Sequence, residues 1–351
     1  MKAFNVRPKE NSGQGPKKHI STTLLLILVP IIVVSIVFII LFLSGQAETQ
    51  IKQLSFQNLE RESDYNAERF GANVSNIVSK AEYLMKSAES VKFANRNEFR
   101  DFQAQAVGIG GNIETAFYTG FMDVDMIYAD GTQVADDYEP RTRGWDKDAV
   151  NGNYQSFTET EPYMDVVFNA MCVSFIKKTT LKDGTFGATG VDIFLTTMSE
   201  ETAALKPLGT GITAVLANDI ILGNPDAAIN GMSVNEAGDE LLKRAYEQIK
   251  AGDSAAIKDD GKVYYVAASA IPGTSWILYS AVPEADVLSA LRTFQKICYV
   301  IMAVIIAIIV IVLLTVISTV ITVPLRKVTN AAVKISEGDF NVDLPTESKN
   351  E

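Results

Sequence analysis

The chain has 351 residues, of which 47% are hydrophobic, and its formal net charge is −11. This acidic balance argues against a nucleic-acid partner, because nucleic acids are held by basic surfaces. The 2 cysteines and 1 histidine exclude a disulfide framework and a cysteine-rich metal site, and we expect no metal and no cofactor.

The first predicted element is a membrane-spanning helix at residues 21–44. Residues 24–43 are almost entirely apolar and carry no charge, and about 20 such residues cross a bilayer core. Small residues directly after the run, such as Ser44 and Ala47, leave a cleaved signal peptide as the alternative. The run is longer than the about 7–15 apolar residues of a signal peptide, which favours the spanning helix.

A second uncharged apolar run predicts another spanning helix at residues 297–323. Basic residues flank both runs on the sides away from the intervening segment, and such flanks stay in the cytoplasm. They are Lys2, Arg7, Lys9, Lys17, Lys18, Arg326 and Lys327. We therefore expect a two-pass protein of the inner or plasma membrane, with residues 1–20 as a cytoplasmic tail and residues 45–296 as an extracytoplasmic domain.

The extracytoplasmic segment begins with a predicted long helix at residues 45–95. Between residues 51 and 93 there is no proline, and apolar residues recur at spacings of three and four, as on one face of a helix. Such a helix packs on a core or at a dimer seam. It also continues from the first spanning helix, so it can carry a displacement to the membrane.

Two β-hairpins are expected next. The first joins residues 124–128 to 132–134 through Asp130-Gly131, and the second joins residues 171–180 to 188–195 through Asp183-Gly184, because Asp-Gly favours tight turns. A polar, aromatic loop at residues 136–165 lies between them.

A further β-rich unit follows from residue 212. It has predicted strands at residues 220–222, 263–270 and 276–282, a helix near residues 239–251 and a turn at Asp260-Gly261. The predicted fold class is α+β: a long N-terminal helix and two antiparallel-sheet modules, flanked by two transmembrane helices. The membrane-distal module is placed at residues 96–205 and the membrane-proximal module at residues 206–290.

Candidate binding residues gather around the loop between the hairpins. Arginine matches a carboxylate through two parallel hydrogen bonds, aromatic residues add directed polar contacts, and a carboxylate takes an ammonium, so the set suits a zwitterion. The candidates are Tyr138, Arg143, Trp145, Asp146, Tyr163, Asp165 and Asp192. From the residues alone, a structural ion pair of Arg143 and a core position for Trp145 are equally open.

The arrangement Tyr138-Glu-Pro-Arg-Thr-Arg143-Gly-Trp145, followed by Tyr163-Met-Asp165 and Gly190-Val-Asp192, resembles the ligand motif of double Cache domains. These PAS-like sensors occur in bacterial chemoreceptors and sensor kinases. Residues 271–276 and 282–286 resemble the end of a proximal Cache module, and residues 323–340 resemble the start of a HAMP relay, placed at 324–351. The resemblance thus covers nearly the whole chain.

This resemblance implies roles for the candidate residues. Arg143 and Trp145 hold the ligand carboxylate, Asp192 takes the amino group, and Tyr138 and Tyr163 complete the site with Asp165 nearby. The family usually has tyrosine directly after the tryptophan, where this chain has Asp146. That departure leaves a cationic amino acid or an amine as alternatives.

The resulting prediction is a chemoreceptor of the methyl-accepting chemotaxis type that senses an amino acid. A sensor histidine kinase input domain and a receptor for amines or small carboxylates are the alternatives, and a transporter accessory or adhesive protein is disfavoured by the relay. We expect no enzymatic activity, because no nucleophile–base arrangement is visible. We expect a homodimer through the relay helix, a cytoplasmic signalling module or kinase complex as partner, and a purely structural proximal module, which lacks the Arg-x-Trp arrangement.

Overall fold

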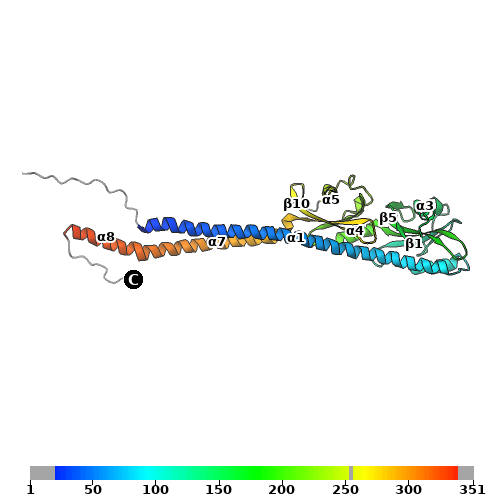
Figure 1. The fold of residues 1–351 in the computed structure, drawn as a ribbon, viewed down its shortest axis with the longest axis horizontal. Coiled ribbons are helices and arrows are strands. Elements are labelled where there is room, and N and C mark those ends of the chain that lie inside the picture. Colours follow the sequence, from blue (N-terminus) through cyan, green and yellow to red (C-terminus); the bar gives the residue numbers. More distant parts are fainter. Residues whose placement is uncertain (1–19, 253–255, 339–351) are drawn as a thin grey trace, which may run out of the picture. The chain divides into compact units, whose positions relative to one another are not determined.

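The computed structural model describes residues 20–252 and 256–338 (Figure 1). The predicted cytoplasmic tail up to residue 19 and the relay beyond residue 338 lie outside the described residues. The chain divides into two compact units, one formed by Gln50–Ser289 and the other by Met1–Thr49 with Ala290–Glu351. Each unit is considered separately below.

The first helix, α1 (Ile20–Ser90), is continuous over 71 residues, so the predicted continuity between membrane helix and long helix is confirmed. It ends at Ser90 and not near Phe93. Phe93 instead packs edge-on against Phe99, with ring centroids 5.3 Å apart. Phe99 belongs to α2 (Arg96–Gln103), whose first turn is capped by the side chain of Asn95.

The first module is an antiparallel sheet with the order β2-β1-β6-β5-β3, and β4 also pairs with β5. Its strands are β1 (Thr115–Phe121), β2 (Met126–Tyr128), β3 (Thr158–Glu159), β4 (Tyr163–Asp165), β5 (Ala170–Thr180) and β6 (Phe186–Phe194). The predicted hairpin through Asp183-Gly184 is confirmed, because β5 and β6 pair along their length.

The first predicted hairpin is wrong. β2 pairs with β1, the strand that precedes it in the chain, and Ile127 lies opposite Thr119. Residues 132–134 form no strand. The side chain of Asp130 accepts hydrogen bonds from the backbone amide and the hydroxyl of Thr132, at 2.9 and 2.8 Å. β2 ends at Tyr128, and the local Asx turn at Asp130 that follows does not reverse the chain into a second strand.

The predicted loop at residues 136–165 is also more ordered than expected. It contains the helix α3 (Gly144–Asn151) as well as β3 and β4. Trp145 and Ala149, four residues apart, form the buried side of α3 in the cluster that covers the outer face of the first sheet. A helix of 8 residues offers too short an apolar pattern to be recognised from the sequence.

The second module is an antiparallel sheet with the order β8-β7-β11-β10-β9. Its strands are β7 (Ile212–Ala217), β8 (Ile220–Gly223), β9 (Ala256–Asp259), β10 (Lys262–Ala270) and β11 (Trp276–Pro283). The predicted helix is confirmed as α5 (Glu240–Lys250), which begins where the side chain of Asp239 accepts from the amide of Leu242. The two modules lie within the predicted segments 96–205 and 206–290, whose exact boundaries remain predictions.

One hydrophobic core joins α1 to the inner faces of both sheets. It includes Phe70 and Val74 of α1, Val191 of β6 and Leu278 of β11, all at most 5% exposed. The helix α4 (Leu195–Ala204) connects the two sheets and contributes Met198 to the same core. The outer faces are covered by α3 in the first module and by α5 in the second, so each module has a separate outer cluster.

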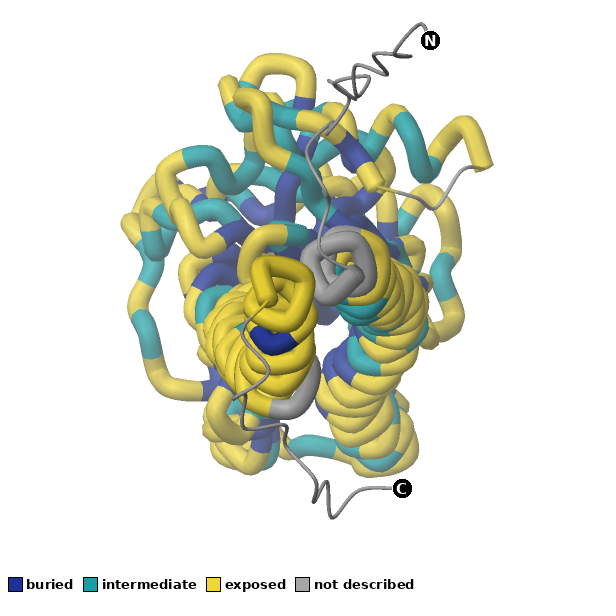
Figure 2. Tube along the Cα trace, turned by 90° about the vertical axis from the view of Figure 1, so that its left-hand side faces the viewer, coloured by how far each residue is buried: buried dark blue, intermediate teal, exposed yellow. Residues whose placement is uncertain are grey.

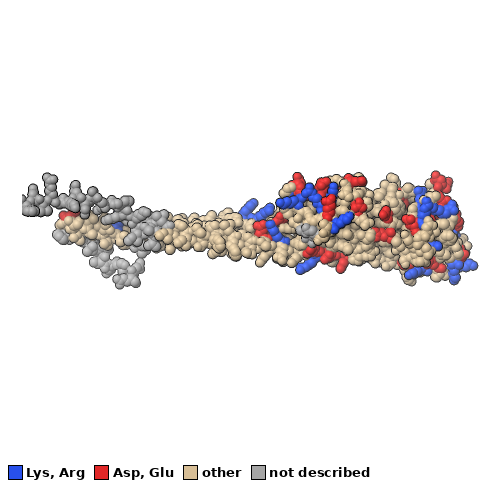
Figure 3. Space-filling view, turned by 45° about the horizontal axis from the view of Figure 1, so that its top comes forward, with Lys and Arg blue, Asp and Glu red and all other residues tan. Residues whose placement is uncertain are grey.

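The smaller unit contains the two apolar helices, which Figures 2 and 3 show as exposed and largely uncharged along their described parts. The first is the N-terminal part of α1. The second runs through α7 (Ser289–Val316), a π-turn (Ile317–Thr322) and α8 (Val323–Ser336). Both are long and apolar enough to cross a membrane, and none of their most apolar stretch is buried, unlike a core helix of a soluble protein.

The predicted break at Pro324 takes the form of this π-turn. Proline lacks an amide donor and clashes with the preceding turn of a regular helix. The wider turn before Pro324 accommodates the ring, and the helix continues into α8. The relay prediction is therefore represented in the described chain by α8 alone.

Candidate ligand-binding site

A cavity of about 440 Å³ opens on the outer face of the first module. One wall comes from the start of α3 and the residues before it, and the other from the segment 160–166 that contains β4. Five of the seven predicted residues line the cavity: Tyr138, Arg143, Trp145, Tyr163 and Asp165. The fold thus brings together side chains that are up to 27 positions apart in the sequence.

Arg143 is the only arginine that lines this cavity within the described chain, and its charge has no partner there. The guanidinium carbon lies 4.5 Å from the ring centroid of Tyr138, above the ring. Its Nε is buried and without a hydrogen-bond acceptor, and no carboxylate among the described residues forms an ion pair with it. The structural ion pair that the sequence left open is therefore not present there.

Trp145 forms the base of the same wall. It is 5% exposed and packs edge-on against Tyr118 of β1, with centroids 4.8 Å apart. This packing requires glycine at position 120, since a Cβ at Gly120 would lie 2.9 Å from Cη2 of the indole. Trp145 is thus both a core residue and part of the cavity wall. The sequence had left a core position and a binding position open as alternatives, and the structure combines them.

Asp192 lies beneath the cavity, near the end of β6, and is fully buried. Its Oδ1 accepts hydrogen bonds from the hydroxyls of Tyr118, at 2.7 Å, and Tyr163, at 3.3 Å, as well as from Ser174. Its Oδ2 is buried without any partner in the described chain. Burial raises the pKa of Asp192 to about 7, although the hydroxyl hydrogen bonds oppose the shift.

The strand register explains how these hydroxyls meet. Ser174 of β5 lies directly opposite Asp192 of β6, in the centre of the sheet. Tyr118 reaches the same carboxylate because its ring lies over Gly190, where a Cβ would come within 2.5 Å of the ring. Tyr163 both lines the cavity and contacts Asp192, so it connects the buried carboxylate to the ligand space.

Asp165 lines the cavity with its carboxylate and is 3% exposed. Its Oδ1 accepts from the backbone amides of Val167 and Phe168, at 2.8 and 2.7 Å. These bonds fix the side chain at the end of β4. A cation in the cavity would therefore meet a preoriented carboxylate.

Asp146 does not line the cavity. It is 1% exposed on α3, and burial raises its pKa to about 7, with a further contribution from Glu139 that Arg141 opposes. Arg141 itself pairs with Glu139 at 2.5 Å on the exposed side of the loop. The departure from the family motif at this position thus lies beside the Glu139–Arg141 pair.

Several residues of the site were not identified from the sequence. Tyr118 and Ser174 lie on buried strands, where a hydroxyl looks like any other strand residue until the register is known. A signal was present, because Ser174 is polar in an otherwise apolar stretch at residues 171–176. Asp148 and Glu161 add carboxylates to the cavity lining, and both are exposed.

The chain was compared with known proteins in sequence and in structure. No family model matches the chain. The methyl-accepting chemotaxis protein McpG of Pseudomonas putida is 31% identical over 227 residues, which make up 63% of this chain and 34% of McpG. The chain therefore spans about a third of the length of this curated relative.

Solved structures of receptor domains are also similar to this chain. The ligand-binding domain of the Pseudomonas fluorescens chemoreceptor CtaA in complex with L-leucine has a TM-score of 0.54 and 20% identity, covering 68% of this chain and 99% of that domain. The protein has the double Cache fold of chemoreceptor ligand-binding domains. The extracellular domain of the histidine-kinase candidate mmHK1S-Z3 also has a TM-score of 0.54, at 16% identity, covering 68% of this chain and 98% of that domain. The fold therefore confirms the resemblance to double Cache domains and the α+β class that the sequence predicted.

Proposed function

We propose that this chain is the sensory part of a transmembrane chemoreceptor and that it binds an amino acid in the cavity of the first module. The observation that carries the proposal is a pair of unmatched charges. Arg143 lacks an anionic partner, and the buried Oδ2 of Asp192 lacks any donor, among the residues that the structure describes. An amino acid brings one carboxylate and one ammonium, and so satisfies both groups at once.

The chemistry of binding follows from the positions of these groups. The ligand carboxylate accepts two parallel hydrogen bonds from Arg143 beside the indole of Trp145. The ligand ammonium donates to Asp165 and, once Tyr163 shifts, to Oδ2 of Asp192. A shift of Tyr163 can be passed to β4, because Tyr163 belongs to that strand.

The comparisons support this function for the whole protein. McpG carries the name of a methyl-accepting chemotaxis protein, and CtaA has been solved with L-leucine bound. The two apolar helices and their basic flanks support a two-pass arrangement with the sensor outside. The proposal includes a homodimer that signals through α8 to a cytoplasmic module, because the apolar positions of α8 suit a parallel helical bundle. The mmHK1S-Z3 fold makes a kinase output the alternative.

The test is thermal unfolding of the segment 45–296 with a panel of amino acids, amines and small carboxylates, because a ligand of the folded state raises the melting temperature. An amino acid should raise it, and Arg143→Ala should weaken the affinity by about tenfold or more. Arg141→Ala is the matched control: this exposed arginine is two positions away and does not line the cavity.

Absence of any shift with amino acids, or a shift that Arg143→Ala leaves unchanged, would overturn the amino-acid site. A shift with amines alone would replace the amino acid by an amine as the ligand class. Neither result alters the fold, so the receptor architecture is tested separately from its ligand.

A further inference from the structure

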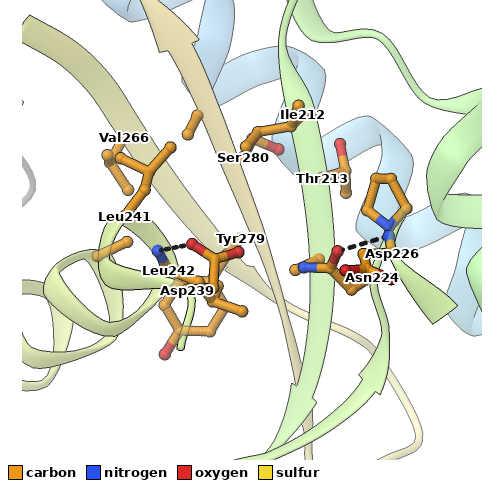
Figure 4. A pocket seen from close by; sticks show the side chains of 14 residues that line it. Ile212, Thr213, Asn224, Asp226, Asp239, Leu241, Leu242, Val266, Tyr279 and Ser280 are labelled. Atoms are coloured by element: carbon orange, nitrogen blue, oxygen red, sulfur yellow. Dashed lines mark hydrogen bonds between the residues drawn. The ribbon is translucent and has the colours of Figure 1, made fainter. Parts of the chain in front are cut away.

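The second module has a cavity of its own on its outer face, about 190 Å³ in volume (Figure 4). It lies between α5 and the strands β7, β10 and β11. An apolar cavity of about 150 Å³ is large enough to hold benzene, so this one has room for a ligand of similar size with a small polar head. The cavity shares no residue with that of the first module.

The inner part of the cavity is apolar. Leu242 and Ala245 of α5, Val266 of β10 and Tyr279 of β11 line it, and all of them are at most 6% exposed. Burial raises the pKa of the Tyr279 phenol to about 12, so this side chain is neutral at physiological pH. These side chains favour an aliphatic or aromatic group.

Two polar side chains of the lining, Asn224 and Asp239, each have an atom without a partner in the described chain. Asn224 is 7% exposed, and its Oδ1 accepts from the amide of Asp226 at 2.8 Å, which leaves Nδ2 free of any partner in the described chain. Asp239 accepts from Leu242 through Oδ1 at 2.9 Å, and its Oδ2 is likewise unpaired among the described residues. Figure 4 shows the Asn224 amide and the Asp239 carboxylate pointing toward one another across the cavity.

The charged residues of the lining determine which sign of charge the ligand can carry. Asp226 and Asp239 are both part of it, and it contains neither lysine nor arginine among the described residues. A cation is therefore favoured over an anion. This is the opposite of the first module, where Arg143 requires a carboxylate.

We propose that this cavity is a second ligand site, which takes a small amino alcohol with an aliphatic or aromatic body. The ammonium donates to Oδ2 of Asp239, the hydroxyl oxygen accepts from Nδ2 of Asn224, and the apolar body lies against Leu242, Val266 and Tyr279. The proposal does not depend on the amino-acid site. It adds a binding role to a module that the sequence predicts to be structural.

The test is calorimetric titration of the full chain in lipid nanodiscs with leucinol. The matched ligand is 4-methylpentan-1-ol, which has the same skeleton without the ammonium. Leucinol should bind, and 4-methylpentan-1-ol should bind at least about tenfold more weakly, because it cannot pair with Asp239. Equal affinity for the two compounds, or no leucinol binding, would overturn the proposal.

Variants locate the binding. Asp239→Asn keeps a good helix-capping residue but removes the charge, and should weaken leucinol binding about tenfold. Ala245→Leu should abolish binding by filling the cavity, whereas Glu240→Gln, which removes a neighbouring charge outside the lining, should have no effect. Loss of binding in Asp192→Asn with retention in Asp239→Asn would place the ligand in the first cavity and refute the second site.

Discussion

At the scale of single residues, Asp192 is a costly group in the ligand-free protein. A carboxylate that is fully buried and satisfied on only one oxygen is destabilising when it is ionised. Three hydroxyls lower this cost without removing it, which is why the pKa of Asp192 remains raised at about 7. A ligand ammonium would supply the missing partner, so the same group that weakens the free protein would strengthen the complex.

This cost predicts how stability depends on pH. The folded-state pKa of Asp192, about 7, exceeds the ordinary value of 3.8, so its stabilising contribution is complete below pH 3.8 and is lost as the pH rises through 7. Relative to Asp192→Asn, the ligand-free wild type should lose about 1.4 kcal/mol of unfolding free energy per pH unit in this window and level off above it.

Chemical denaturation of the segment 45–296 at several pH values measures this difference. Asp146, which also has a raised pKa, is present in both proteins and cancels in the comparison. Parallel stability profiles for the two proteins would mean that Asp192 titrates normally. The raised pKa, and with it the energetic argument for the ligand ammonium, would then be wrong.

At the scale of elements, the segment from β3 to β4 connects the candidate site to the second module. Glu159 of β3 accepts hydrogen bonds from the indole nitrogen of Trp276, at 2.5 Å, and from the hydroxyl and amide of Ser275, at 2.7 and 2.9 Å. Tyr163 lies only four residues further along and lines the cavity. If ligand binding shifts β4, the shift would reach β11 through this short, hydrogen-bonded connection.

Replacing Glu159 should uncouple the modules and leave ligand binding in place. In the wild type, we expect the amino acid to increase hydrogen-exchange protection at residues 275–282. In Glu159→Ala this increase should be lost, because the three bonds to Ser275 and Trp276 are absent, while affinity should change by less than about threefold. Glu159→Gln is the matched control, since its amide oxygen still accepts from the indole. Equal ligand-induced protection in wild type and Glu159→Ala would exclude this route.

A second connection holds the first sheet to α1. Lys177 of β5 is 2% exposed, and its Nζ lies 3.4 Å from Oε1 of Glu82 and 3.3 Å from Oε1 of Glu89, both on α1. A buried ammonium requires such partners because an unpaired charge in the core is costly. The long helix is thus attached to the sheet by charge as well as by its apolar face.

At the scale of the whole molecule, the apolar face of α8 has no cover within the described chain. Leu325, Val328 and Ile335 are 44%, 48% and 38% exposed, and Ala332 is also exposed. Positions three and four apart lie on one side of a helix, so these residues form a stripe. A second copy of the chain would cover it, as in a parallel helical bundle.

Disulfide trapping in native membranes tests this dimer. Val328→Cys, in a chain that also carries Cys298→Ser, should cross-link rapidly on mild oxidation and migrate as a dimer without reductant. Lys327→Cys is the control, because the neighbouring position points about 100° away around the helix. Similar rates for the two variants, or no dimer from Val328→Cys, would contradict packing through this stripe.

Local patterns in the sequence determined much of this protein. The two apolar helices, the long helix α1, the β5–β6 hairpin and α5 were predictable, because run length, helical periodicity and Asp-Gly turns act over a few residues. The motif around Arg143 and Trp145 also named five residues that the fold brings to one cavity.

Only the tertiary structure decided the remaining features, because they depend on pairing between distant strands. Residues 126–128 could pair with the segment that follows them or with the strand that precedes them. The sheet decides this, and they pair with β1, the preceding strand. The hydroxyls of Tyr118 and Ser174 meet Asp192 through the β1-β6-β5 register, and one carboxylate oxygen stays unpaired as a result. Asp146 lies outside the cavity because α3, unrecognised in the sequence, turns it toward Glu139 and Arg141.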